Sequence, residues 1–303
     1  MGLRKDIWRP AIAHAPIDQI VAQGSLDGIP LTWLPPMGSF RFLADPFGWW
    51  RDGLLQVFVE AYDYRDRRGT IEVLTYDRGF DLLDRRPALS CPWHLSYPFL
   101  VEAEGEMWML PESHRSGRLT LYRSVRWPDI WEPAADIPLD TIAIDASPIF
   151  HQGRWWLFYA PLGNEEEKMG ALHCAWAERL SGPWTPHPLN PVRRDIAGAR
   201  PGGTPYSDGD EIVLPVQDCA RTYGGAISAL RIAVTPTAFS SQLGPRIVSP
   251  AIASPFVEGL HTLSAAGAVT VVDMKRTELS PHGLAIEIRR EAGKLVRRLA
   301  GRR

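Results

Sequence analysis

The feature that most constrains this chain is a hairpin pattern that recurs five times. Its first copy runs from Asp45-Pro46 through an Asp-Gly turn at 52–53 into an apolar stretch that ends in Glu60. An Asp-Gly pair between two apolar runs is typical of a β-hairpin. The copies begin at 45, 96, 145, 200 and 261, so successive copies start 51, 49, 55 and 61 residues apart. Because a four-stranded propeller blade has a period near this length, the sequence predicts an all-β fold, a five-bladed β-propeller.

Further strands can be assigned around these hairpins. A third strand follows each of the first four copies, at residues 70–76, 119–124, 171–176 and 226–232. The Trp- and Pro-rich segments 127–137 and 182–192 are expected to supply outer strands, and the segment 31–34 would complete the last blade. A two-sheet β-sandwich would also show short strands at regular spacing. It has no reason, however, to repeat one starting motif five times.

The last residues differ from the rest of the chain. We expect the propeller to span residues 1–280 and a short basic C-terminal helix or tail to span 281–303, where Ile288, Ala292, Leu295 and Leu299 fall on one helical face. Such a helix could contact an anionic membrane surface. A helix packed on the propeller with a frayed basic end is the simpler interpretation.

Charge and cysteine content narrow the partners. The chain has 33 lysines and arginines against 35 aspartates and glutamates, so no global positive field would attract nucleic acid. Cys91, Cys174 and Cys219 are far apart and odd in number, which fits free thiols better than a disulfide framework. Neither a secretory leader nor an apolar run of about eighteen residues is evident. We therefore expect a cytoplasmic protein.

Polar residues recur where the paired strands start and end. In a propeller the first strand of each blade lines the channel and the second runs back beside it, so both of these ends lie at one mouth. The nine residues expected to converge there are Asp45, Glu60, Tyr97, Glu112, Asp145, Arg200, Gln217, Asp218 and His261. Ser96, next to Tyr97, is a further candidate for binding the substrate.

Fixed donors and acceptors of this kind suit the hydroxyl groups of a saccharide or glycoconjugate. For any one of these residues, an ion pair that only stabilises the fold is an equally good interpretation. Isolated His94, His114, His151 and His173 lack the spacing of a metal site. Phosphate-loop, dinucleotide and nucleophile-elbow motifs are not found either, so we expect no metal and no cofactor.

Eight short motifs carry a resemblance to a known family. They lie at 42–47, 95–99, 110–113, 144–147, 181–184, 199–202, 217–219 and 259–262. In this order they resemble the N-terminal propeller of plant glucosamine inositolphosphorylceramide transferases and of its bacterial relatives, from about Trp8 to Lys275. The resemblance implies the fold more than an activity.

More distantly, the chain is similar to the five-bladed glycoside hydrolases of families 43, 32 and 68. That resemblance implies a base or nucleophile at Asp45 and an orienting carboxylate at Asp145. Where those enzymes have a glutamic acid as proton donor, this chain has Arg200, which cannot donate a proton near neutral pH. Glu112 and Asp218 are the candidates for a relocated donor, and Arg200 would suit an anionic group on the ligand.

Two functions are consistent with these residues. The leading hypothesis is an enzyme that cleaves or transfers a glycosyl unit, in which Asp45 and Asp145 act with Glu112 or Asp218 as proton donor. The alternative is a non-catalytic carbohydrate-recognition module that works beside a glycosyltransferase or a sugar-modifying enzyme. A protein-binding propeller is a third possibility, but it would not need carboxylates clustered in its channel.

Overall fold

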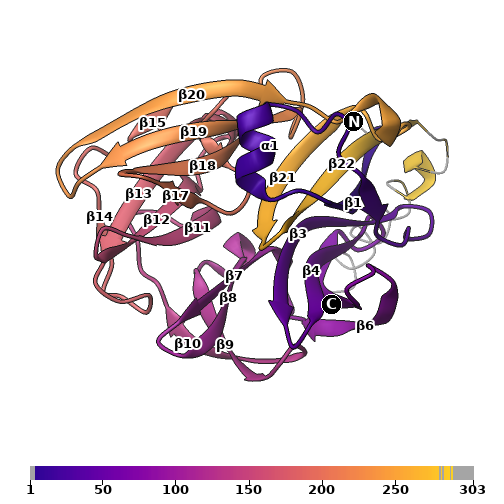
Figure 1. Ribbon diagram of the computed structural model, residues 1–303, viewed down its shortest axis with the longest axis horizontal. Coiled ribbons are helices and arrows are strands. Elements are labelled where there is room, and N and C mark those ends of the chain that lie inside the picture. The colour runs from indigo at the N-terminus through magenta and orange to yellow at the C-terminus, as the bar shows by residue number, and fades with distance from the viewer. Residues whose placement is uncertain (1–3, 280, 282, 287, 289–303) are drawn as a thin grey trace, which may run out of the picture.

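The computed structural model describes residues 4–279, 281, 283–286 and 288. Its strands form five antiparallel sheets that follow one another around a central axis (Figure 1). The prediction of a five-bladed β-propeller is therefore confirmed. Residues 283–286 are helical, in agreement with a short C-terminal helix. Ala292, Leu295 and Leu299, on which its apolar face was predicted, lie outside the described residues.

The first two blades each consist of four consecutive strands. From the channel outward, blade 1 contains β3 (Arg41–Arg51), β4 (Leu54–Asp63), β5 (Arg68–Tyr76) and β6 (Leu82–Leu89). Blade 2 contains β7 (Ser96–Ala103), β8 (Glu106–Glu112), β9 (Thr120–Arg126) and β10 (Ile130–Asp136). The outer strand expected within 127–137 is β10.

Blades 3 and 4 are less regular. Blade 3 contains β11 (Ala143–His151), β12 (Arg154–Pro161) and β13 (Ala171–Ala177), with two short strands, β14 (Thr185–Pro186) and β15 (Arg193–Arg194), paired to β13. The inner edge of blade 4 is split into β16 (Arg200–Pro201) and β17 (Tyr206–Asp208), followed by β18 (Glu211–Asp218), β19 (Ala226–Val234) and β20 (Phe239–Ile247).

The two ends of the described chain close the ring in blade 5. Its inner strands β21 (Gly259–Ala266) and β22 (Val269–Leu279) are joined by β1 (Arg4–Ala13) and β2 (Leu31–Trp33). The prediction that residues 31–34 complete this blade is confirmed. β1 was not predicted from the sequence, although it pairs with β22 over ten residues from Arg4 opposite Leu279 to Ala13 opposite Thr270. Its charged start and internal Pro10 obscured the strand pattern.

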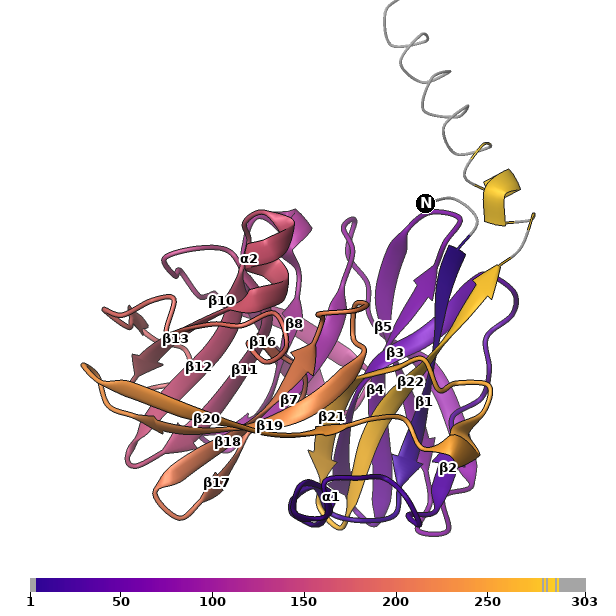
Figure 2. The ribbon, with the colours of Figure 1, turned by 90° about the horizontal axis from the view of Figure 1, so that it is seen from above.

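Two short helices lie at opposite ends of the propeller axis (Figure 2). α1 (Ile17–Gln23) covers one end. α2 (Glu165–Gly170) stands at the other, where Asn164 and Glu167 form a reciprocal capping box. None of the helices in the described part of the chain is long and apolar enough to cross a membrane.

Candidate functional site

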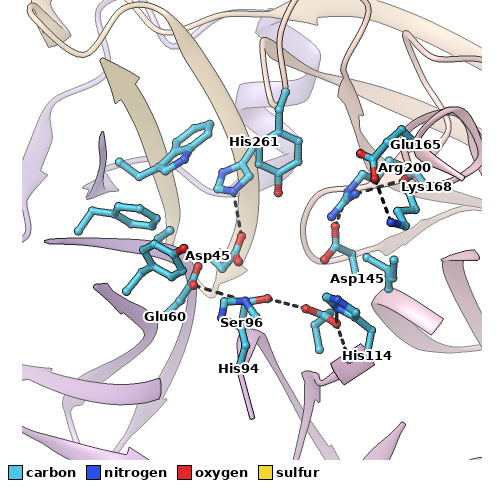
Figure 3. A pocket seen from close by; sticks show the side chains of 17 residues that line it. Asp45, Glu60, His94, Ser96, His114, Asp145, Glu165, Lys168, Arg200 and His261 are labelled. Atoms are coloured by element: carbon cyan, nitrogen blue, oxygen red, sulfur yellow. Dashed lines mark hydrogen bonds and ion pairs between the residues drawn. The ribbon is translucent and has the colours of Figure 1, made fainter. Parts of the chain in front are cut away.

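A cavity of about 310 Å³ opens at the end of the channel where α2 lies (Figure 3). This volume is at the small end of the range of ligand pockets. Seven of the ten candidate site residues predicted from the sequence line the cavity: Asp45, Glu60, Ser96, Glu112, Asp145, Arg200 and His261. All five blades contribute to this group, and each of the seven residues is more than nine-tenths buried.

A recurrent β-bulge determines where the inner strands place these side chains. In β3 the pairing with β4 shifts between Ala44 and Phe47, and equivalent shifts occur near the starts of β7 and β11. At these bulges Asp45, Tyr97 and Asp145 have φ angles of 48°, 46° and 51°. Residues with a side chain rarely adopt this left-handed conformation. Because a bulge redirects a side chain, the repeated irregularity brings two aspartates to the cavity from different blades.

The other three predicted residues do not line the cavity. The phenol of Tyr97 contacts Ser147 Oγ at 2.8 Å and accepts a hydrogen bond from the backbone N–H of Gly203 at 2.6 Å, so it ties three blades together. Gln217 supports the cavity from behind, since its Nε2 donates to Asp145 Oδ2 at 3.2 Å. Asp218 is instead ion-paired with Arg246 at 2.5 Å.

His261 lies between two carboxylates. Its Nδ1 is 2.7 Å from Asp273 Oδ1, and its Nε2 is 3.3 Å from Asp45 Oδ1. Burial disfavours the charged imidazole, but Asp273 and Asp45 outweigh it and raise the pKa of His261. Burial also raises the pKa of Asp45 to about 7, although His261 acts in the opposite direction. His261 thus lies between two carboxyl groups, and the pKa of one of them, Asp45, is raised towards neutral pH.

The donor atoms of Asp45, His261 and Asp273 lie within 4.8 Å of one another, close enough to share a metal ion. Asp273, however, already accepts hydrogen bonds from the backbone N–H groups of Asp45 at 2.8 Å and Thr262 at 2.9 Å, as well as the contact with His261. The hydroxyl of Thr262 donates to Asp45 Oδ1 at 3.0 Å. These bonds use most of the oxygen lone pairs that a metal would need, so the cluster is better described as a hydrogen-bond network.

Arg200 and Asp145 form a buried ion pair. The Nε of Arg200 donates to Asp145 Oδ2 at 2.8 Å, and its Nη1 donates to the backbone oxygen of Lys168 at 3.3 Å. Burial raises the pKa of Asp145 despite the opposing charge of Arg200. The guanidinium therefore acts first as the counter-ion of Asp145.

Glu112 is held by donors from its own loop. Its Oε1 accepts from the backbone N–H of His114 at 2.6 Å and lies 2.6 Å from His114 Nδ1, while Ser96 Oγ donates to Oε2 at 3.0 Å. Burial would raise the pKa of this carboxyl, but the hydrogen bonds from His114 outweigh burial and lower it. Glu112 is thus an ionised group at neutral pH.

Glu60 differs from the other acids, because it accepts no hydrogen bond from any described residue. The Nε2 of His94 lies 3.6 Å from its Oε1, which is beyond hydrogen-bond distance. His94 Nδ1 accepts the N–H of Gly69 at 2.8 Å, and burial lowers the pKa of His94 to about 4, so this imidazole is neutral. Burial, together with the nearby carboxylates, raises the pKa of Glu60 well above its usual range.

Aromatic rings form part of the cavity wall. Trp8 stacks on the imidazole of His261 with ring centroids 3.8 Å apart, and the rings of Phe42 and Tyr62 stack at 4.9 Å. Tyr223 lies edge-on to His261 at 5.3 Å. The cavity therefore offers both fixed polar groups and apolar faces.

Several lining residues were missed at the sequence level. They are Trp8, Phe42, Ala44, Tyr62, His94, His114, Ile144, Glu165, Lys168 and Tyr223. Asp273, which anchors His261 without lining the cavity, was also missed, although it ends the second strand of the fifth hairpin. This position could have identified Asp273 from the sequence, because the ends of the corresponding strands were the source of the predictions for Glu60 and Glu112.

Residues 36–241 match the sequence profile of the family described as "Glucosamine inositolphosphorylceramide transferase 1, N-terminal". The enzyme of that name from Oryza sativa subsp. indica is 33% identical over 204 residues, which are 65% of this chain and 27% of the rice protein. The enzyme of the same name from Arabidopsis thaliana is 33% identical over 199 residues, 64% of this chain and 26% of that protein. The matched region thus spans about a quarter of each plant relative.

Among solved structures, a family 117 glycoside hydrolase from Zobellia galactanivorans superposes with a TM-score of 0.58 at 13% identity, covering 91% of this chain and 92% of that one. The GH43_1 enzyme from Xanthomonas citri gives a TM-score of 0.56 at 12% identity, with coverages of 80% and 89%. At these identities the likeness shows a shared propeller fold.

Proposed function

The chain belongs to the family of the N-terminal domains of glucosamine inositolphosphorylceramide transferases, and we propose that it binds a saccharide in its central cavity. The observation that carries this proposal is the convergence of seven buried polar side chains from five blades on one small cavity. Each hydroxyl group of a sugar needs a fixed donor or acceptor, and the faces of a sugar ring pack on aromatic rings. Trp8, Phe42, Tyr62 and Tyr223 supply such rings.

The printed name of the plant relatives and the propeller shared with glycoside hydrolases support carbohydrate as the ligand class. The carboxyl groups predicted as proton donors do not support catalysis. A hydrolase needs a proton donor beside the glycosidic bond. Of the two predicted candidates, Glu112 is held in its ionised form by His114, and Asp218 pairs with Arg246 away from the cavity. A recognition module that works with a sugar-modifying enzyme needs no such donor.

Cleavage or transfer of a glycosyl unit is the second candidate function, and one observation favours it. Asp45 titrates near neutral pH, as expected for a general base, and it is oriented by contacts with His261 and Thr262. In that reaction Asp45 would accept the proton of the attacking hydroxyl group, and Asp145 would orient the sugar. The two candidates agree on the binding site and differ in whether products form.

An anionic ligand, which the sequence suggested through Arg200, is a weaker proposal. The guanidinium lies 2.8 Å from Asp145, and the ammonium of Lys168 lies 3.0 Å from Glu165 Oε1. These two cationic side chains of the cavity are therefore already ion-paired with carboxylates. A cytoplasmic location, suggested by three free thiols, also stays a proposal.

Calorimetric titration with a panel of neutral, amino and acidic monosaccharides and disaccharides tests the binding proposal. We expect at least one saccharide to saturate the wild-type protein and to lose most of its affinity with His261→Ala, because that change removes a cavity wall and the support of Asp45. Glu132→Gln, on the outer strand β10 and paired with Arg123, is the matched control. If no saccharide saturates, or if His261→Ala binds like the control, the proposal fails.

A further inference from the structure

Glu60 is the one carboxylate among the described cavity-lining residues that lacks a polar partner within hydrogen-bond distance. The other four are each engaged: Asp45 by Thr262, Glu112 by His114 and Ser96, Asp145 by Arg200 and Gln217, and Glu165 by Lys168. Glu60 is 6% exposed, and it projects from β4 into the cavity. Its carboxyl group faces the cavity, where a ligand can supply the hydrogen-bond donor that no described residue supplies.

The surroundings of Glu60 are acidic. Figure 3 shows Glu60 and Asp45 on one side of the cavity, with Arg200 and Lys168 on the other. Burial raises the pKa of Glu60 first, and the charges of neighbouring carboxylates raise it further. His94 does not compensate for them, because it is neutral. Burial and the neighbouring carboxylates therefore favour the protonated form of Glu60, and a positive charge beside it would favour the carboxylate.

Aromatic rings adjoin the same position. Tyr62 follows Glu60 by two residues along β4, so both side chains point to one face of the sheet. The ring of Phe42 stacks on Tyr62 at 4.9 Å. The faces of aromatic rings attract ammonium groups, and carboxylates form short charge-assisted hydrogen bonds with them.

We propose that Glu60 is the recognition point for a primary ammonium group, and that the cavity takes a saccharide with a free amine. This inference rests on the proposed saccharide site and specifies its substrate class. A hydroxyl group at the same place could satisfy one oxygen of Glu60, but it would leave the repulsion among the carboxylates unchanged. An N-acetylated amine has no charge, and its acyl group would enlarge the ligand. The free amine is therefore the group that this side of the cavity selects.

Proton release distinguishes this proposal from neutral-sugar binding. When the ammonium group arrives, Glu60 loses its proton and the carboxylate pairs with the cation. Below neutral pH the ammonium stays charged, so affinity should fall by up to about tenfold per pH unit as Glu60 becomes harder to ionise. The groups whose titration or charge also acts on Glu60 are Asp45, Glu112, Asp145, Asp273, His94 and Tyr64.

The experiment compares glucosamine, N-acetylglucosamine and glucose by calorimetry at pH 6, in two buffers with different enthalpies of ionisation. For wild type we expect glucosamine to bind roughly tenfold to a hundredfold more tightly than glucose. Only glucosamine should give a buffer-dependent enthalpy that reports proton release. Glu60→Gln should bring the two affinities within about twofold and abolish the proton release, because the amide cannot ionise. Glu132→Gln removes one charge far from the cavity and should retain the preference.

The outcomes separate this inference from the proposed function. If glucose binds as tightly as glucosamine, or if the preference persists in Glu60→Gln, the ammonium site is wrong while the saccharide site stands. If none of the three sugars binds and the wider saccharide panel also fails, both are wrong. If Glu60→Gln does not fold, wild type still decides, because glucosamine binding without proton release would overturn the proposal.

Discussion

The buried pair of Arg200 and Asp145 allows a test of how the cavity is held together. We consider Arg200→Met, which keeps the length of the side chain and removes its charge. Asp145 would then retain only the hydrogen bond from Gln217, with no cation beside it. Removing one partner of a buried ion pair typically lowers the free energy of unfolding by about 3–5 kcal/mol, because the remaining charge is uncompensated. We expect a loss in this range at pH 7.5.

The pH dependence gives the sign of the effect. Burial already raises the pKa of Asp145 in the wild-type protein, and Arg200 opposes that rise. Without Arg200 the folded-state pKa rises further above the unfolded value. A carboxyl group with a raised folded-state pKa binds more protons in the folded state, so stability falls as pH rises from the unfolded pKa towards the folded one. The loss in free energy of unfolding caused by Arg200→Met should therefore be smaller at pH 5.5 than at pH 7.5.

Urea denaturation of wild type, Arg200→Met and Arg200→Met/Asp145→Asn at both pH values provides the measurement. The double variant carries no buried charge at this position and should recover much of the loss at pH 7.5. Asp45 and Glu60 also have raised pKa values, but they titrate in all three proteins, so the difference between proteins reports Asp145 and its effect on these two neighbours. A loss below about 1 kcal/mol, or a deficit that is equal at both pH values, would refute the argument that Arg200 mainly neutralises Asp145.

Three further predictions follow from the cavity. Asp45→Asn should abolish any cleavage of glycosides, measured by product formation, and should lower the free energy of unfolding by only about 1 kcal/mol, because an amide oxygen can still accept from Thr262. Asp273→Ala should lower that free energy by about 4 kcal/mol or more, since it leaves His261 and two backbone N–H groups without their acceptor. In calorimetry a uronate should bind no more tightly than the matching neutral sugar, because Arg200 and Lys168 are already paired. Tighter binding of the uronate would support the anion site that the sequence suggested.

The recurring hairpin was sufficient to predict the fold and seven of the seventeen residues that line the cavity. Each copy of the hairpin starts at the same place in its blade, so residues far apart in sequence, such as Asp45 and Asp145, could be placed at one mouth from the sequence alone. The prediction was less specific at the ends of the second strands. Because successive side chains of a strand point to opposite faces, only one of Gln217 and Asp218 could face the cavity. The periodicity alone did not say which of the two would face inward.

The repeated hairpin pattern does not predict the cavity residues that lie between the blades. His94 and His114 lie outside the regular strands, and nothing in their spacing indicated that one contacts Glu60 and the other fixes the charge of Glu112. Trp8 lies on β1, which enters the cavity only because the N-terminal strand closes the last blade. The strand that closes the ring pairs with the sheet edge that is left free, and a local sequence pattern does not identify that edge.

The charge of the cavity follows from the substitution at Arg200. An acid there would have shared blade 4 with Gln217 and faced Asp145 as a second carboxyl group; the arginine instead gives Asp145 a fixed counter-ion at 2.8 Å. Glu60 in blade 1 has no such counter-ion among the described side chains, and burial together with its acidic neighbours raises its pKa. Glu60 lies across the cavity from Arg200 (Figure 3). Because a cation on the ligand can neutralise Glu60 and no described side chain does, ligand charge is the property that this cavity is built to distinguish.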